Sequence, residues 1–438
     1  LLMNIGPQPN GELPAVAVER LKGVGIFLII YIVLALTFGY TMIVAETAIG
    51  RMTRKSPVGA FKSFGKKKWL SFGGWINAVI PVLIVPYYSV IGGWVIKYLV
   101  EYFRGNAKLL AEDGYFTDFI SNGVSTELCF VAFCAFTLII IFAGVQNGIE
   151  RVSKIMMPIL IVLSVIIAVY SVTRPGALAG VKYFLVPNVK NFSWMTVVSA
   201  MGQMFYSLSI AMGILITFGS YMKKDTAIED STRNVEIFDT GIAIMAGLMI
   251  IPAVFAFSGG DPDTLQAGPS LMFITIPKVF QNMGFGTVIG IVFFLLVLFA
   301  AVTSSIALTE SAVSTFEDEL GWGRKKATVL VGVIMLALGS LSSLGYGPLA
   351  GIKIIGMQFL DLFDFLTNSV MMPIAALLTS LFVSRVVGID KIEAEIIHGE
   401  SAFRRKKVFV VMIKYLCPVF AIIILLSSVA NALGWIKM

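Results

Sequence analysis

The sequence predicts an all-helical integral membrane protein that crosses the bilayer many times. Of its 438 residues, 57% are hydrophobic and only 13% are charged, and the mean hydropathy is +0.89. Soluble domains carry about 25% charged residues. The apolar residues form runs of about 20, which is the length that a helix needs to cross a hydrocarbon layer of roughly 30 Å. We therefore expect a polytopic helical membrane protein.

The apolar runs define ten expected spans joined by polar loops. Several are long enough that they must tilt or extend beyond the bilayer. No heptad repeat, low-complexity tract or separate soluble domain interrupts them, so residues 23–438 are expected to form one ten-span domain. The expected spans are 23–50, 75–103, 126–145, 154–172, 194–221, 236–258, 285–315, 327–345, 355–387 and 408–435.

The loop charges predict the orientation. The loops after the odd-numbered spans carry 21 Lys and Arg, whereas the other loops and the C-terminal end carry eight. Positive residues concentrate on the cytoplasmic side, so we expect an external C-terminus in the plasma (inner) membrane. Because the net charge of +7 resides in these short loops, it indicates orientation, and we expect no nucleic-acid partner.

Residues 1–22 are expected to form an external segment outside the membrane. They contain three Pro and two Gly and resemble no cleavable signal peptide. An external N-terminus without a signal is an unusual topology. We therefore expect a further span before residue 1, which would place the true N-terminus inside.

Cysteine and histidine usage argues against metal-dependent and triad-based chemistry. Cys129, Cys134 and Cys417 all lie within apolar runs, where packing is the expected role. His398 is the only histidine and lies in a polar loop. A single imidazole offers neither a His-based metal site nor a catalytic triad. We therefore expect that the protein is not an enzyme.

The fifth span contains a polar, glycine-spaced segment within an apolar run. It reads GQMFYSLSIAMGILITFGSY from Gly202, and it includes Gln203, Tyr206, Ser207 and Ser209. Such a segment can unwind, which frees carbonyl and hydroxyl oxygens for a cation and presents helix ends to a charged solute. The alternative is a helix-packing face of small residues. We favour the functional interpretation.

The seventh span contains AAVTSSIA at 300–307. The hydroxyls of Thr303 and Ser304, with the carbonyl of Ala300 if its helical bond is loosened, are oxygen ligands of the kind that sodium prefers. Ser and Thr in membrane helices also bond back to the preceding turn. Both interpretations stay open on the sequence.

Acidic residues within spans are costly and indicate functional sites. A buried carboxylate must be paired, protonated or bound to a cation. For Asp239 in the sixth span we favour ion coordination over structural hydrogen bonding. For Glu46 in the first span we favour a structural role, in which it accepts backbone N–H groups of a neighbouring broken helix. Asp361 and Asp364 in the ninth span lie near one helical face.

The second span contains Pro86-Tyr87-Tyr88, with Ile84 one turn before Tyr88. A tyrosine in a bundle core has an apolar ring and a hydroxyl that requires a partner. Ordinary packing and ligand binding are both consistent with this pattern.

Six segments combine these features in a specific order: GYTMIVAETAIGR, VPYYSVIGGW, GQMFYSLSIAMGILITFGSYM, DTGIAIMAGLMIIPAVFAF, AAVTSSIALTES with FEDEL, and FLDLFDFL. They resemble the neurotransmitter:sodium symporter family in its bacterial eleven-span amino-acid branch, essentially from Gly23 to the C-terminus. The resemblance implies the inverted-repeat sodium symporter fold, with ten spans present and the first absent. It also implies sodium ions, an amino-acid substrate, a lipid bilayer and no organic cofactor.

The resemblance implies roles for the matching substrate-site positions. Tyr88 would hydrogen-bond the substrate carboxylate, and Tyr206, above Tyr88, would form the external aromatic lid. Asp364 would be the acidic partner of the external gate. The side-chain pocket would be lined by Ile84, Tyr206, Ser209, Ala211, Met212 and Leu308.

The resemblance implies ion sites as well. Ser207 and Asp239 resemble ligands of the sodium nearer the substrate. Tyr31, Gln203 and Ser207 match positions that bind chloride in chloride-dependent relatives. Those relatives have Asn where this chain has Asp239, whose carboxylate could supply the negative charge, so we expect chloride independence. The second sodium site would be contributed in part by Ala300, Thr303 and Ser304.

The sequence departs from the family at its start. The family's first span is also broken and contributes to both sodium sites, and residues 1–22 do not match it. The two inverted five-helix repeats place the partner of the broken fifth span before residue 1. We therefore expect the chain to be an incomplete copy.

The expected function is sodium-coupled symport of a neutral, apolar amino acid. Ala211 stands where many relatives have Gly, and its methyl group narrows the pocket, so we expect aliphatic substrates to be favoured over tryptophan. One alternative is a non-transporting membrane receptor or remnant of a transporter, for which the absent span is the argument. A membrane-embedded transferase is a weaker alternative, because it would require a His, paired acids or an activated nucleophile.

Overall fold

The computed structural model describes residues 24–187, 192–259 and 268–432, and the expected external segment 1–22 lies outside them. The described part is almost entirely helical, and its only strand-like pairing is an isolated bridge between Ile354 and Met357. The expectation of an all-helical fold is confirmed over these residues.

Nine of the ten expected spans are continuous helical stretches within the described residues, several of them interrupted by short π-helical turns. They are α2–η1–α3 (Val24–Leu34, Ala35–Gly39, Tyr40–Thr53), α5 (Lys68–Phe103), α8 (Gly123–Phe142), η2–α9 (Val145–Glu150, Arg151–Val172), α13 (Ile228–Ser258), α15 (Gly286–Leu320), α16 (Arg324–Leu344), α17–η6–α18–η7 (Phe359–Asp364, Phe365–Met371, Met372–Phe382, Val383–Val387) and α20–η8–α21 (Lys406–Val411, Met412–Leu416, Cys417–Ala432).

The remaining span is broken in the middle, as the sequence predicts. It consists of α11 (Trp194–Ser207) and α12 (Ile214–Tyr221), which are separated by the non-helical residues 208–213. Each half is too short to cross a bilayer alone. Together they occupy the length that the sequence assigns to the fifth span.

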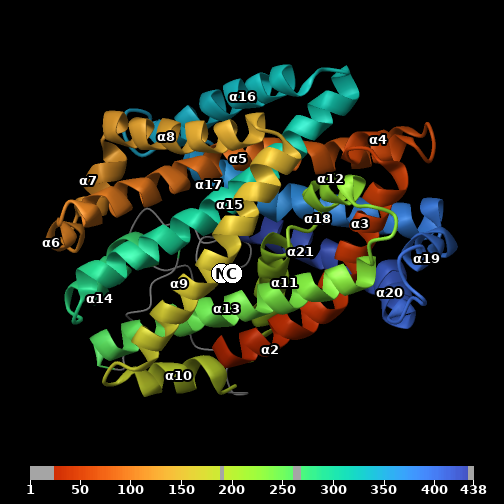
Figure 1. Cartoon of the computed structure of the whole chain (residues 1–438). Coiled ribbons are helices and arrows are strands. Elements are labelled where there is room, and N and C mark those ends of the chain that lie inside the picture. Colours follow the sequence, from red (N-terminus) through yellow and green to blue (C-terminus); the bar gives the residue numbers. More distant parts are fainter. Residues whose placement is uncertain (1–23, 188–191, 260–267, 433–438) are drawn as a thin grey trace.

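The long helices α5 and α15 pack against each other in the centre of the bundle, with α8 and α16 beside them (Figure 1). The half-helix α12 packs closely on α3, because glycines occupy the crossing on both helices. A Cβ atom on Gly50 of α3 would lie 2.8 Å from the carbonyl carbon of Ile216, and one on Gly219 of α12 would lie 2.5 Å from the carbonyl oxygen of Thr47. Small residues at such contacts allow two backbones to approach within a membrane.

Short helices cover one end of the bundle (Figure 1): α6 (Ala107–Leu110), α7 (Tyr115–Ser121), α10 (Ala177–Leu185), η5 (Leu271–Thr275) and α14 (Ile276–Gln281). Aromatic rings attach two of them to α5. Phe116 of α7 stacks on Phe273 of η5 with ring centroids 5.2 Å apart, and the Tyr98 hydroxyl donates to the Phe273 carbonyl at 2.7 Å. Residues 271–281 therefore form a short helical cap at this end of the bundle, whereas residues 260–267 lie outside the described part.

The opposite end carries α4 (Pro57–Lys62) and α19 (Ile389–Ile397) (Figure 1). A buried ion pair joins α3 to α19 there, because Nε of Arg51 lies 2.7 Å from Oε1 of Glu395. Arg51 also donates to the Thr226 carbonyl at 2.5 Å, just before α13. One guanidinium thus connects three segments that are far apart in the sequence.

We expect Gly50→Ala to destabilise the protein by about 1–3 kcal/mol, because the added methyl group would force α3 and α12 apart. Gly241→Ala is the matched control, since Gly241 is also helical but has nothing within 4 Å of its Cβ position. The measurement is the thermal unfolding midpoint of each purified variant in detergent. Equal midpoints for the two variants would contradict the close-packing argument.

Candidate functional site

The break between α11 and α12 is built from an unusual backbone. Ser209, Ala211 and Gly213 have φ angles of +54°, +58° and +70°, respectively. Only Gly adopts this left-handed region without steric cost, so Ser209 and Ala211 are strained and must be held by their surroundings. Strain of this kind clusters at ligand-binding sites.

Two contacts hold the break in place. The backbone N–H of Ala211 donates to Oε1 of Glu46 on α3 at 2.8 Å, and Glu46 is fully buried. Gly213 lies so close to α4 and α5 that a Cβ atom there would be 2.7 Å from Cγ of Pro57 and 2.8 Å from the carbonyl oxygen of Asn77. The broken segment is therefore fixed between α3, α4 and α5.

A carboxylate with two hydroxyl donors lies at the end of α11. Oδ1 of Asp239 on α13 accepts from the Ser207 hydroxyl at 2.7 Å, and its Oδ2 accepts from the Tyr31 hydroxyl at 2.6 Å. Tyr31 is fully buried on α2. Gln203, one turn before Ser207, is 3% exposed, and its Oε1 has no hydrogen-bond partner among the described residues. The carboxylate oxygens of Asp239 thus lie beside the hydroxyl oxygens of Ser207 and Tyr31. This set of oxygen ligands fits a hard cation such as sodium.

The α15 segment presents a second set of oxygen atoms. The hydroxyl of Thr303 donates back to the carbonyls of Phe299 and Ala300, each at 3.0 Å. This is the local bonding that the sequence leaves open, and it still leaves the hydroxyl lone pairs available as ligands. Ser304 is exposed, and its hydroxyl interacts with that of Tyr88 on α5. The structure thus brings Ser304 together with Tyr88.

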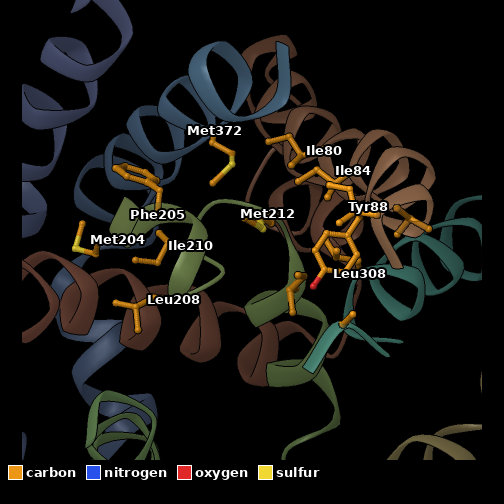
Figure 2. Close-up of a cluster of buried hydrophobic side chains, with 14 of the residues drawn as sticks. Ile80, Ile84, Tyr88, Met204, Phe205, Leu208, Ile210, Met212, Leu308 and Met372 are labelled. Atoms are coloured by element: carbon orange, nitrogen blue, oxygen red, sulfur yellow. The ribbon is translucent and has the colours of Figure 1, made fainter. Parts of the chain in front are cut away.

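Apolar side chains gather around the break (Figure 2). Ile84 of α5 is fully buried, whereas Tyr88, Met212 and Leu308 retain exposed fractions of only 7%, 2% and 5%. They come from α5, the broken segment and α15, and no labelled side chain in Figure 2 is ionisable apart from the Tyr88 phenol. Such a cluster fits an apolar group.

Another carboxylate, that of Asp364, contacts Tyr87, the neighbour of Tyr88 on α5. The Tyr87 hydroxyl donates to Oδ1 of Asp364 at 3.2 Å, and Nδ2 of Asn368 donates to the same oxygen at 2.5 Å. Tyr206 lies within electrostatic range of both Tyr88 and Asp364. Among the described residues no ring contact joins Tyr206 to Tyr88, so the lid arrangement stays a prediction.

Comparison with known proteins decides the family. Residues 103–435 match the sodium:neurotransmitter symporter family. A Bacillus subtilis protein, named the uncharacterized sodium-dependent transporter YhdH, is 33% identical over 412 residues, which cover 93% of this chain and 90% of that protein. An uncharacterized sodium-dependent transporter of Haemophilus influenzae is 30% identical over 424 residues, which cover 93% of this chain and 91% of its own. The chain belongs to the sodium:neurotransmitter symporter family.

A solved structure supports the same conclusion at the level of the fold. The crystal structure of MhsT in complex with L-phenylalanine matches with a TM-score of 0.84 and 33% identity, and the match covers 95% of this chain and 94% of that one. The family and fold expected from the sequence are thereby confirmed. This symporter-family chain is a multi-pass membrane protein whose relatives are sodium-dependent transporters, and it is not an enzyme.

One buried acidic residue is not among the site residues that the sequence predicts. Glu310 on α15 is fully buried, and its Oε1 accepts from the Tyr221 hydroxyl at 2.8 Å. Its Oε2 accepts from Arg324 at the start of α16 at 2.6 Å. The sequence does place Glu310 within a largely apolar span, which is a signal of a buried acid. Its ion-pair partner Arg324 could not be recognised, because in the sequence it is an ordinary loop cation.

We expect Glu46→Ala to lower stability by about 1–3 kcal/mol, because it leaves the buried N–H of Ala211 without an acceptor. Glu46→Gln retains an acceptor oxygen and is the matched control, which should lose much less. The measurement is the unfolding midpoint, followed by sodium-dependent ligand binding at a temperature where both variants are folded. A Glu46→Ala protein as stable as wild type would show that the hydrogen bond does not hold the break.

Proposed function

We propose that this symporter-family member transports a neutral, apolar amino acid together with sodium. The observation that carries the proposal is the strained break at 208–213, with an apolar cluster on one side and the Asp239 carboxylate at the end of α11. The free ends of two half-helices bind charged groups of a solute, and apolar walls accept its side chain. An apolar amino acid has both kinds of group, because its amino and carboxylate groups are charged and its side chain is apolar.

The substrate pocket is assigned to residues of α5, α11, the broken segment and α15, namely Ile84, Tyr88, Tyr206, Ser209, Ala211, Met212 and Leu308. None of these side chains offers a charged partner, so a charged substrate side chain would lose its hydration without compensation. The structure of MhsT, to which this chain is similar, contains L-phenylalanine. That likeness supports an apolar amino acid as the substrate class.

Sodium is assigned to two places. Ser207 and Asp239 would ligate the ion nearer the substrate, and Ala300, Thr303 and Ser304 would contribute to the second. Gln203 and Tyr31 lie where the resemblance implies chloride in other members. Since Asp239 already supplies a negative charge there, we propose that transport does not require chloride.

Asp364, held by Tyr87 and Asn368, would serve as the acidic partner of the external gate. This assignment is consistent with the distribution of loop cations, which predicts that the end bearing α4 and α19 is cytoplasmic and that the C-terminus is external. The membrane would be the plasma (inner) membrane.

We expect Asp239→Ala to weaken sodium-dependent amino-acid binding by on the order of 100-fold or more, because it removes a charged ligand from a partly buried ion site. Asp239→Asn keeps an acceptor oxygen but removes the charge, so it should make binding responsive to chloride. Two measurements test this: the binding of a radiolabelled amino acid, and its uptake into proteoliposomes. In each, sodium and chloride are replaced separately. Chloride-dependent binding by the wild-type protein would contradict the charge assigned to Asp239. Absence of sodium-dependent uptake would favour a non-transporting protein.

We expect neutral aliphatic amino acids to compete best for the site. The series is alanine, valine, leucine, methionine, tryptophan, glutamate and lysine against labelled leucine. One methylene group is worth only about 1–3 kcal/mol in an apolar pocket, so discrimination among aliphatic substrates should be modest. Strong competition by glutamate or lysine would end the apolar-pocket assignment.

Ala211→Gly should improve tryptophan binding relative to leucine binding, because it removes a methyl group from the pocket. The readout is the ratio of the two affinities, since relief of backbone strain at φ +58° affects both ligands equally. An unchanged ratio would show that Ala211 does not limit substrate size.

A further inference from the structure

Three lysines lie just before and at the start of helix α5. Lys66, Lys67 and Lys68 are all exposed, and none has an ion pair within the part of the chain that the structure describes. Two large aromatic residues follow on the same helix, where Phe72 and Trp75 have exposed fractions of 55% and 39%. A transporter surface thus combines unneutralised cations with exposed rings.

The helix geometry places these groups on one face. Residues three and four apart are neighbours on a helix, so Lys68, Phe72 and Trp75 form one outward stripe. The opposite side of α5 is closed by α4, because Cβ atoms on Gly73 and Gly74 would lie 2.8 Å from atoms of Phe61 and Val58, respectively. The face of α5 that carries Lys68, Phe72 and Trp75 therefore lies on the outer surface of the helix bundle.

Helix α4 adds another cation to this stripe. Its last residue, Lys62, places Nζ 5.9 Å from the centroid of the Trp75 ring, and the same atom is 2.5 Å from Oε2 of Glu319. The pairing with Glu319 fixes the lysine beside the aromatic ring. We call the six residues Lys62, Lys66, Lys67, Lys68, Phe72 and Trp75 the basic–aromatic patch.

Among the described residues Glu319 pairs with Lys62 alone, and Lys66, Lys67 and Lys68 have no ion pair. The first turn of α5 contains no acidic residue, and its N-cap residue, Lys67, makes no side-chain capping hydrogen bond. Lysines there repel one another and the positive end of the helix dipole. A negative group from outside the chain would offset both effects.

The depth of the patch indicates what that group is. Lys68 and Trp75 are seven residues apart, or about 10 Å along the helix, and the headgroup layer on each side of a bilayer is roughly 5–8 Å thick. When Trp75 lies at the boundary of the hydrocarbon, as tryptophan prefers, the lysines lie at the level of the lipid phosphates. This end of the bundle also carries most of the loop cations, which is the arrangement expected of a cytoplasmic surface rich in anionic lipids.

We propose that the basic–aromatic patch binds the headgroup of an anionic phospholipid. The ammonium groups of Lys66, Lys67 and Lys68 contact the phosphate and its negatively charged substituent, and Phe72 and Trp75 pack along the upper part of the acyl chain. The exposed rings favour a lipid over a soluble anion, because a soluble anion offers nothing to cover them. This binding site is separate from the substrate and sodium sites.

The test measures lipid preference by tryptophan fluorescence. The full chain is reconstituted in vesicles of phosphatidylcholine with brominated phosphatidylglycerol or, in parallel, brominated phosphatidylcholine, and quenching by the two lipids is compared. A lysine near the surface contributes about 1 kcal/mol to binding of anionic lipid, which is about fivefold in affinity. Replacing all three lysines with Gln should therefore reduce the preference for phosphatidylglycerol by tenfold or more.

Two further variants make the result specific. Replacing Lys223, Lys224 and Lys407 with Gln removes the same charge from exposed positions outside the patch and should leave the preference unchanged. Replacing Lys66, Lys67 and Lys68 with Arg preserves the charge and should retain the preference, which also shows that the segment tolerates substitution. Trp75→Phe should remove a large part of the lipid-specific quenching.

An undiminished preference in the triple Gln variant would overturn the proposal, and so would an equal loss in the control variant or a loss in the Arg variant. The substrate assignment would stand in each case, because amino-acid binding is measured separately on the same preparations.

Discussion

The structure depends on one constraint, which is that polar backbone groups within a bilayer must find partners inside the protein. An unbroken helix satisfies this requirement by itself, but the segment between α11 and α12 does not. Its N–H at Ala211 is satisfied by the carboxylate of Glu46, from a helix more than 150 residues earlier in the chain. Close contacts at Gly50, Gly213 and Gly219 bring α3, α4 and α5 near enough to enclose the break. The break in this one helix therefore constrains how the neighbouring helices pack.

The same constraint explains why the candidate site lies where it does. Where a helix stops, its carbonyl and hydroxyl oxygens become available to an ion, and its left-handed residues turn the chain toward the central helices. Ser207 thereby meets Asp239 at the end of α11, and Met212 meets Ile84 and Leu308 from α5 and α15. Polar and apolar groups are adjacent because one short segment supplies both. A substrate with a charged backbone and an apolar side chain fits this adjacency.

Charged residues at the end of the bundle that bears α4 connect helices to one another, in addition to indicating the orientation of the protein in the membrane. Arg51 with Glu395 joins α3 to α19, and Arg324 with Glu310 and Tyr221 joins α16 and α15 to the half-helix α12. Buried pairs of this kind are costly to break, because removal of one partner leaves an uncompensated charge. Movement of α12 relative to the central helices must therefore disturb the Tyr221 hydroxyl's contact. The lysines at the start of α5 differ, because they have no partner among the described residues.

The sequence alone determined the membrane class, the spans and the position of the break, because hydrophobic length and the clustering of Gly, Ser and Tyr are local properties. It also indicated Asp239, Glu46 and Asp364, since acids are conspicuous in apolar runs. The partners of these acids were decided by tertiary structure: Tyr31 with Asp239, Ala211 with Glu46, and Tyr87 with Asp364. The sequence also left Thr303 undecided between back-bonding and ion coordination. A hydrogen bond requires two atoms within about 3 Å, and only the packing of helices distant in the sequence brings such atoms together.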